Sequence, residues 1–211
     1  MTKKQALLII TQCAKQYHQY LENNQVAFVY RNQNNHSNFT AVQFHSHNFL
    51  HFTGVSVKAE MTANNFYRAA LNNRLSENDF FFKHPYTSAQ KLKILPTITT
   101  IDAKARMIGT YTGPHVKLYT EKVTGTTNAC LGLIHTKNYY IPNSVLNEDI
   151  RSITPKPPGK IYAIFKKTIK SPYYTRLTYK SPNVSIIKRC LPKELFNEIE
   201  PSLLEDILST L

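Results

Sequence analysis

The sequence predicts an α+β protein in which N-terminal helices pack on a C-terminal antiparallel β-meander sheet. In the first half of the chain, apolar residues recur mainly at helical spacing, whereas in the second half they alternate with polar residues. Turn-forming residues such as Asn, Gly, Thr and Pro separate the alternating segments, which is typical of strands joined by short turns. Helices followed by strands favour a sheet covered by helices, because each element must bury its apolar side.

The N-terminal region predicts one helix and a hairpin. Over residues 3–22 the apolar positions share one helical face, and they are Ala6, Leu7, Ile10, Ala14, Tyr17 and Leu21. Two segments with strand composition follow, Val26–Arg31 and Phe39–His45. The polar loop NQNNHSN between them predicts that the two strands form a hairpin.

Two further helices are expected before the meander. Thr62 is a favourable N-cap for a helix that extends to Leu75, and Ser88 is a favourable N-cap for a helix that Pro96 ends or kinks. The segment TITTIDAKARMI that follows is ambiguous. Its β-branched residues favour a strand, whereas its Ala103–Met107 part favours a helix.

The second half predicts four or five antiparallel strands. The alternating or apolar segments are 116–123, 129–135, 139–145, 160–169 and 176–181. A Pro-rich stretch, TPKPPG at 154–159, connects the third of these segments to the fourth. The last segment, 193–209, has a helical pattern that Pro201 interrupts.

The charge predicts an anionic partner. The chain has 26 Lys and Arg against 13 Asp and Glu, a net charge of +13, which favours nucleic acid first and a membrane surface second. Residues 193–211 are acidic by contrast, with five carboxylates against the single Lys193. This segment could be an acidic tail over a basic groove, but an ordinary helix with a solvated acidic face is the preferred interpretation.

The cysteines and the hydropathy pattern predict a cytoplasmic protein. The three cysteines are widely spaced and form no CxxC pair, so a disulfide scaffold and a zinc knot are both disfavoured. The apolar run Ala6–Ile10 is too short for the core of a signal peptide. No stretch approaches the roughly 18 apolar residues that a membrane-spanning helix needs, so no membrane partner is expected.

The stretch HSHNFLHFTG, residues 45–54, raises the question of a metal site. In a strand, His45, His47 and His51 would share one face, and three imidazoles can bind zinc. Six residues of extended chain separate the first from the last, about 20 Å, which is too far for one ion unless the chain bends. No acidic residue lies nearby to orient the ligands. We therefore expect no metal and no cofactor, although a bend at Asn48 or Gly54 would keep the alternative open.

Four short motifs in a fixed order resemble a known family. They are FLHFTGV at 49–55, FYRAALNNRLSENDF at 66–80, the Lys91–Leu92 helix and NACLGL at 128–133. Together they resemble a phage-associated group of the barnase–EndoU–colicin–RelE (BECR) superfamily of metal-independent RNases. The resemblance covers about residues 45–180, and Phe52 stands where the family pattern has Leu. It implies a barnase/RelE-like fold with a domain at 45–190, preceded by a helix and hairpin at 1–44 and followed by an acidic helix at 191–211, in one compact unit.

The resemblance implies a metal-independent ribonuclease or nuclease-fold toxin of phage or mobile-element type that attacks RNA through the 2′-OH. Its substrate would be tRNA or another single-stranded RNA, and an inhibitor or a phage or host protein would be a second partner. Histidine suits the proton transfers and lysine suits the charged transition state. The catalytic candidates are His51 and Lys91, and Lys91 is expected near a helix start where backbone N–H groups also bind anions. The nucleic-acid-binding candidates are Thr53, Lys58, Arg106, Tyr111 and Lys117.

Each of these residues also has an ordinary structural interpretation. His51 could bond a backbone carbonyl, the lysines could be solvated, and Thr53 could bond its own turn. At the level of function, the alternatives are a catalytically inactive module that binds nucleic acid through its positive charge, and a protein-interaction domain for an acidic partner. Salt-sensitive RNA binding without product would identify the first, and a stable protein complex without nucleic-acid affinity would identify the second.

Overall fold

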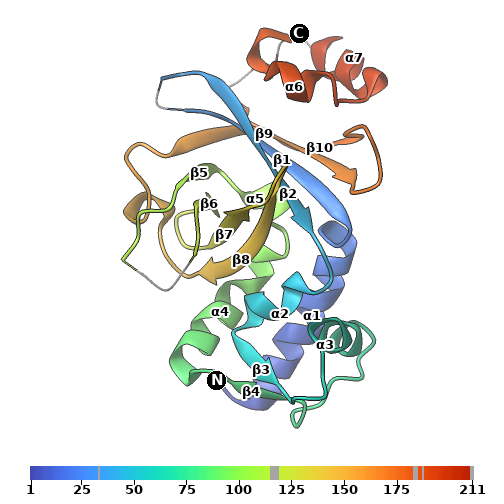
Figure 1. Ribbon diagram of the computed structural model, residues 1–211, viewed down its shortest axis with the longest axis vertical. Helices are drawn as coiled ribbons and strands as arrows, with labels where there is room; N and C mark the ends of the chain where they lie inside the picture. The colour runs from blue at the N-terminus through green and yellow to red at the C-terminus, as the bar shows by residue number, and fades with distance from the viewer. Residues whose placement is uncertain (33, 115–118, 183–184, 187, 210–211) are drawn as a thin grey trace.

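A closed ring of strands stands where the sequence predicts an open meander (Figure 1). The computed structural model describes residues 1–32, 34–114, 119–182, 185–186 and 188–209. Within these ranges seven strands form a barrel, and β10 (Arg176–Lys180) pairs with β9 outside the ring. The ring order is β1 (Asn24–Arg31), β2 (Ser37–Phe44), β8 (Tyr140–Leu146), β7 (Cys130–His135), β6 (Lys122–Gly125), β5 (Met107–Thr110) and β9 (Gly159–Thr168).

The N-terminal hairpin closes this barrel, so the prediction of N-terminal helices packed on a C-terminal antiparallel meander is wrong. The hairpin itself forms as expected, but β1 also pairs with β9 along its whole length, from Asn24 opposite Thr168 to Arg31 opposite Lys160. Four consecutive residues, 26–29, are apolar and fully buried, which requires a strand covered on both faces. β2 then meets β8 in parallel through Val42 and Tyr140, which makes the sheet mixed.

The helices among the first hundred residues gather at one end of the barrel (Figure 1). Thr2 caps α1 in a capping box with Gln5, and Thr62 caps α3 as the sequence predicts. A short antiparallel pair, β3 (Val55–Val57) with β4 (Phe80–Phe82), lies among the helices. These helices are α1 (Lys3–Tyr20), α2 (Asn48–Thr53), α3 (Ala63–Leu71) and α4 (Pro85–Ile98), and the short α5 (Ile101–Lys104) follows them.

The third predicted helix begins earlier and ends later than its sequence suggests. α4 starts at Pro85, because proline is well tolerated at the first helical position, where its missing N–H costs nothing. Ser88 is therefore not the cap but a buried residue inside the helix, and Pro96 is accommodated without ending it. The ambiguous segment that follows divides into the end of α4, the helix α5 and the strand β5.

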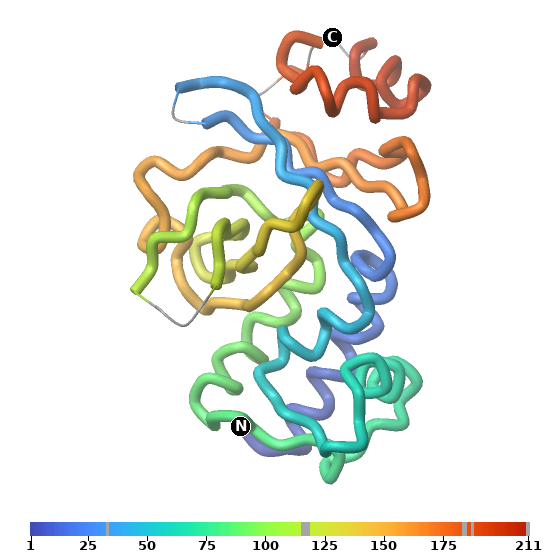
Figure 2. The backbone as a smooth tube through the Cα atoms, in the orientation of Figure 1, coloured from blue at the N-terminus to red at the C-terminus, as the bar shows by residue number. Residues whose placement is uncertain are grey.

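Two large apolar cores hold the barrel and the helices together. One joins the barrel interior to the helices, with Phe28, Phe44 and Phe49 among its fully buried members. The other lies between the outer face of β1 and β9 and the C-terminal helices α6 (Lys193–Phe196) and α7 (Pro201–Ser209), and includes Leu195 and Ile207. The acidic segment is thus packed against the barrel, at the end opposite to α2 and α4 (Figure 2). In the described ranges, no helix has both the length and the apolar character needed to cross a bilayer.

Candidate active site

The histidine-rich stretch forms a turn and a short helix rather than a strand. β2 ends at Phe44, and the Asn48 side chain accepts a hydrogen bond of 2.7 Å from the backbone N–H of His45, which folds the chain back into α2. From α1, the Tyr17 hydroxyl donates to the His45 carbonyl at 2.8 Å. Gly54 ends α2 with a left-handed φ of +71°, a conformation that glycine adopts without strain. The bend that the sequence leaves open is therefore present.

The three histidines lie near one another but do not assemble a metal site. The rings of His45 and His47 stack with their centroids 5.4 Å apart, and burial together with His47 lowers the pKa of His45. His47 precedes His51 by one helical turn, which places both on one face of α2. In the part of the chain that the structure describes, no three His, Cys, Asp or Glu side chains are grouped so that they could hold a metal ion.

His51 is exposed, and its imidazole is surrounded by positive charge. Partial burial lowers the pKa of the ring, and the neighbouring Lys83, His47 and Lys91 lower it further. Because a charged neighbour of the same sign disfavours protonation, the ring is neutral over more of the physiological pH range than an ordinary histidine. A neutral, accessible imidazole beside two lysines can accept a proton from an anionic substrate that the lysines bind.

Lys91 connects three elements at this site. Its Nζ donates to the hydroxyl of Ser144, a buried residue of β8, at 3.2 Å. Its alkyl chain passes the end of α2 so closely that a Cβ at Gly54 would lie 2.9 Å from Lys91 Cδ. Ser88, one turn earlier on α4, donates to the Gly54 carbonyl at 2.6 Å. Burial, and then the charge of Lys83, lower the pKa of Lys91.

The expectation that Lys91 stands at a helix start is wrong. Because α4 begins at Pro85, Lys91 is in the second turn, where the backbone N–H groups are used within the helix. An anion at Lys91 would therefore be bound by the side-chain ammonium alone, without help from free backbone N–H groups.

Thr53 and Lys58 follow His51 in the chain but have local partners. Thr53 is fully buried, and its hydroxyl donates to the Leu50 carbonyl at 2.8 Å, so it bonds within its own turn. Lys58 lies 3.8 Å from Asp79 in a partly exposed ion pair, which also lowers the pKa of Asp79 after its stronger bonds to Ser76. The nucleic-acid-binding roles of both residues remain predictions.

Arg106 and Tyr111 flank β5, on the barrel, rather than lie against α2. Arg106 is exposed, and its guanidinium stacks on Tyr179 at 3.9 Å from the ring centroid. Tyr111 packs against the small apolar cluster formed by Val123, Cys130, Leu146, Ile150 and Ile153. Lys117 lies outside the described residues. The structure thus brings His51 and Lys91 together, and places Arg106 and Tyr111 elsewhere.

Sequence reasoning missed two members of the site. Lys83 immediately follows β4, and the pairing of β4 with β3 carries it towards His51. Ser144 is a buried polar residue of β8, and it becomes notable only once Lys91 is seen to contact it. Neither residue belongs to a motif. Each reaches the site only because distant segments of the chain come together in the fold.

The fold is a closed mixed β-barrel with helices at one end, and His51 and Lys91 lie close together at that end of a strongly basic chain. Over residues 9–183, the chain matches the model of the family described as phage-Barnase-EndoU-ColicinE5/D-RelE like nuclease 4. The match covers most of the chain, and the protein belongs to this family, as the motif order predicts. The matched range also begins before residue 45, so it includes most of α1 and the whole β1–β2 hairpin. No curated protein and no solved structure matches the chain.

Proposed function

We propose that the protein is a metal-independent endoribonuclease, with His51 as general base and Lys91 as general acid. Membership of a nuclease-like family supports a phosphodiester-cleaving reaction. The observation that carries the assignment is the exposed imidazole of His51, with its pKa lowered by burial and by Lys83 and Lys91 beside it. This combination provides a neutral base within reach of a bound phosphodiester.

The proposed reaction is an intramolecular transfer. His51 takes the proton of the ribose 2′-OH, the 2′ oxygen bonds to phosphorus, and the bond from phosphorus to the 5′ oxygen breaks. Lys91 gives the departing 5′ oxygen a proton, for which its lowered pKa makes it a stronger acid than a solvated lysine. Lys83 balances the extra negative charge of the phosphorane. The products are a 2′,3′-cyclic phosphate and a 5′-hydroxyl, and no metal takes part.

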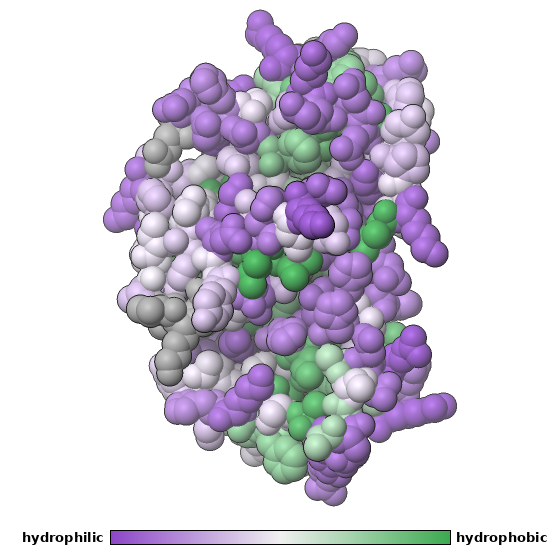
Figure 3. Space-filling view, viewed as in Figure 1, coloured by the Kyte–Doolittle hydropathy of each residue, from purple (hydrophilic) through white to green (hydrophobic). Residues whose placement is uncertain are grey.

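Single-stranded RNA, including tRNA loops, is the proposed substrate. The net charge of +13 favours a polyanion, and the face in Figure 3 is largely hydrophilic. An activity of this kind is dangerous to the cell that makes it. A toxin role in phage or mobile-element biology, with an inhibitor protein as partner, belongs to the same proposal.

The test is incubation of the purified protein with tRNA and an unstructured RNA in EDTA. His51→Ala is the variant, and His36→Ala, at an exposed histidine between β1 and β2, is the matched control. Cleavage by the wild type and by the control but not by His51→Ala supports the proposal. Intact RNA in all samples, or equal cleavage by His51→Ala, would count against it.

A second function is a basic nucleic-acid-binding module of the same fold that does not cleave. The charge alone favours it, because phosphate contacts need no catalytic geometry. A gel shift that weakens steeply with salt, together with RNA that stays intact, would select this alternative.

A further inference from the structure

A lysine crosses the inside of the barrel without an acidic partner. Lys122 lies on β6, which pairs only with β5 and β7, yet its Nζ reaches Tyr30 of β1, Thr40 of β2 and the ring of Tyr140 of β8. Contacts to strands that are not neighbours in the ring must pass through the barrel interior. The side chain is therefore directed inward, among positions that are otherwise mostly apolar.

The ammonium of Lys122 is held loosely. Tyr30 and Thr40 offer only hydroxyl oxygens, each at 3.4 Å, which is long for a hydrogen bond to a charged donor. An ammonium has three N–H donors, so at least one is left over. In the described part of the chain, no carboxylate pairs with Lys122. A partly buried cation without a counter-charge is costly, and a bound anion would offset that cost.

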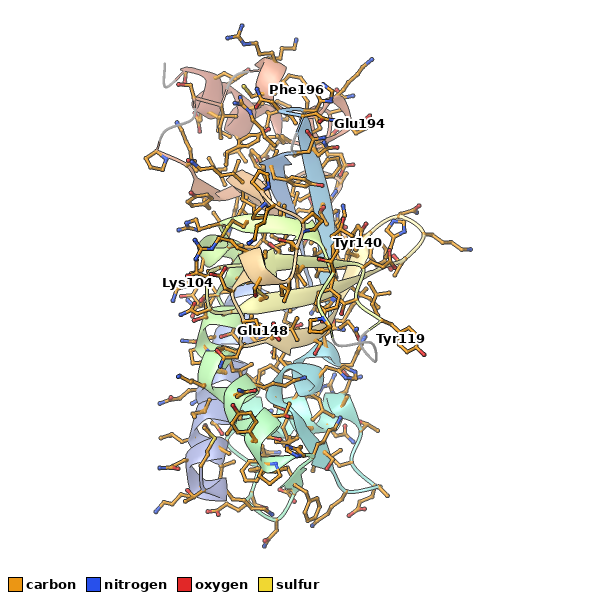
Figure 4. The ribbon with its side chains drawn as sticks, turned by 90° about the vertical axis from the view of Figure 1, so that its left-hand side faces the viewer. Lys104, Tyr119, Tyr140, Glu148, Glu194 and Phe196 are labelled. Atoms are coloured by element: carbon orange, nitrogen blue, oxygen red, sulfur yellow. The ribbon has the colours of Figure 1, made fainter. Side chains whose placement is uncertain are left out.

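A cavity opens at this lysine. Its volume is about 320 Å³, near the lower end of the range for small-molecule sites, roughly 300–1,000 Å³. The segments around it lie on one side of the barrel in Figure 2, and they are the tip of the β1–β2 hairpin, β5 and the Pro-rich stretch before β9. Tyr140, labelled in Figure 4, belongs to the barrel wall and contributes the ring over which Lys122 Nζ lies, 5.0 Å from its centroid.

The walls of the cavity are suited to a planar group beside the anion. Pro155, Pro157 and Pro158 form an apolar side, and the aromatic ring of Tyr30 is a further surface against which a base can stack. Asn32 lines the same cavity, and its side-chain oxygen already accepts from the N–H groups of Asn34 and His36. Its NH₂ group is not used in those bonds and can donate to a base edge.

A neighbouring hollow does not share these properties. It shares Pro157 and Pro158 with the first cavity, and its charged residues are Asp149, Arg151 and Lys156. The side chains of Asp149 and Arg151 form a close ion pair, so the charge of this arginine is already neutralised. The unpaired cation distinguishes the cavity at Lys122 as the place for an anion.

We propose that this cavity is a nucleotide-binding site, in which Lys122 binds the phosphate and Tyr30 with the proline wall holds the base. It is separate from the His51 centre. Nucleotide binding at this cavity does not depend on RNA cleavage, because it can be measured in a protein that lacks His51. The occupant is a single nucleotide unit, either free or part of an RNA strand.

Calorimetric titration of the full chain with adenosine 5′-monophosphate tests the proposal. We expect saturable binding by the wild type, and weakening by about tenfold or more in Lys122→Met, which keeps the alkyl chain but removes the charge. Lys137→Met, at an exposed lysine between β7 and β8, is the control, and it should bind like the wild type, as should His51→Ala. Tyr30→Phe keeps the ring and removes the hydroxyl, so it should weaken binding less than Lys122→Met.

Further titrations separate phosphate from base and free nucleotide from strand. Adenosine and inorganic phosphate should each bind more weakly than the nucleotide. In His51→Ala, competition by a tri-adenylate RNA would assign the site to a strand, and its absence would assign it to free nucleotides. Failure of the wild type to bind the nucleotide, unchanged affinity in a folded Lys122→Met, or equal affinity for inorganic phosphate would each overturn the proposal. Circular dichroism confirms that the variants are folded.

Discussion

Lys91 Nζ lies 3.2 Å from the hydroxyl oxygen of Ser144, so a cation carried by a helix is fixed by a buried strand residue of the barrel. The helices and the barrel meet at this contact. Because His51 lies on α2, which packs on both α4 and β8, the position of Lys91 relative to His51 depends on it.

Replacement of Ser144 by alanine removes the acceptor and leaves Lys91 free to adopt other rotamers. We expect RNA cleavage to fall about tenfold, because a charged group that is not held in place loses part of its catalytic effect. Stability should fall by about 1 kcal/mol, the typical net value of one hydrogen bond. Initial rates and urea unfolding measure the two effects. Ser152→Ala, at an exposed serine, is the control, and an equal loss in both variants would contradict this role of Ser144.

Gly54→Ala is expected to damage both the fold and the site. A left-handed φ costs a residue with a side chain about 1–2 kcal/mol, and the new Cβ would also lie 3.2 Å from Ser88 Cα and 2.9 Å from Lys91 Cδ. The midpoint of thermal unfolding should therefore move to a lower temperature. RNA cleavage should fall by more than the smaller fraction of folded protein explains. A variant with wild-type stability and activity would show that the close approach of α2 to α4 has no role.

The pH profile should report the charge around His51. If neutral His51 is the base, kcat/KM rises with pH through its pKa, which lies below the usual value for histidine. Lys83→Met removes a positive neighbour, so protonation becomes easier, the pKa rises and the acid limb of the profile moves to higher pH. Lys93→Met, at an exposed lysine of α4, should leave the limb in place. A shift of the limb to lower pH in Lys83→Met would contradict the assignment.

The buried ion pair between Lys166 and Asp102 should matter for stability alone. The two side chains are 2.6 Å apart and almost completely buried, and they join β9 to α5. Asp102→Asn leaves the lysine charge unpaired inside the protein, at a cost of about 3–5 kcal/mol. The double variant Asp102→Leu with Lys166→Met should lose less in urea unfolding than Asp102→Asn. If Asp102→Asn leaves the free energy of unfolding unchanged, the ion pair does not stabilise the fold.

Local sequence signals explain which parts of the fold could be predicted. Thr62 capped its helix as expected, and the apolar runs between turn residues located β7 and β8, because caps and short runs depend on neighbouring residues. The ring closure could not be predicted in this way, since the pairing of β1 with β9 joins residues more than a hundred positions apart. The fully apolar run at 26–29 was the available signal, and it indicates a central strand.

The members of the candidate site could be predicted only in part. The motif order pointed to His51 and Lys91, and the structure brings them together. The motif order could not point to Lys83, which the β3–β4 pairing brings to the site, or to Ser144. Arg106 and Tyr111 flank β5 and lie elsewhere on the barrel. Residue chemistry indicates what a side chain can do, but strand pairing decides which side chains meet.

The central claim is metal-independent attack by the ribose 2′-OH, and the products of a single cleaved linkage test it most directly. A short RNA that the protein cuts should be compared, in EDTA, with the same RNA carrying a 2′-deoxy sugar on the 5′ side of the cleaved bond. The account predicts a 2′,3′-cyclic phosphate from the first RNA and no cleavage of that bond in the second. Cleavage of the deoxy substrate, or a product with a 5′-phosphate, would contradict it.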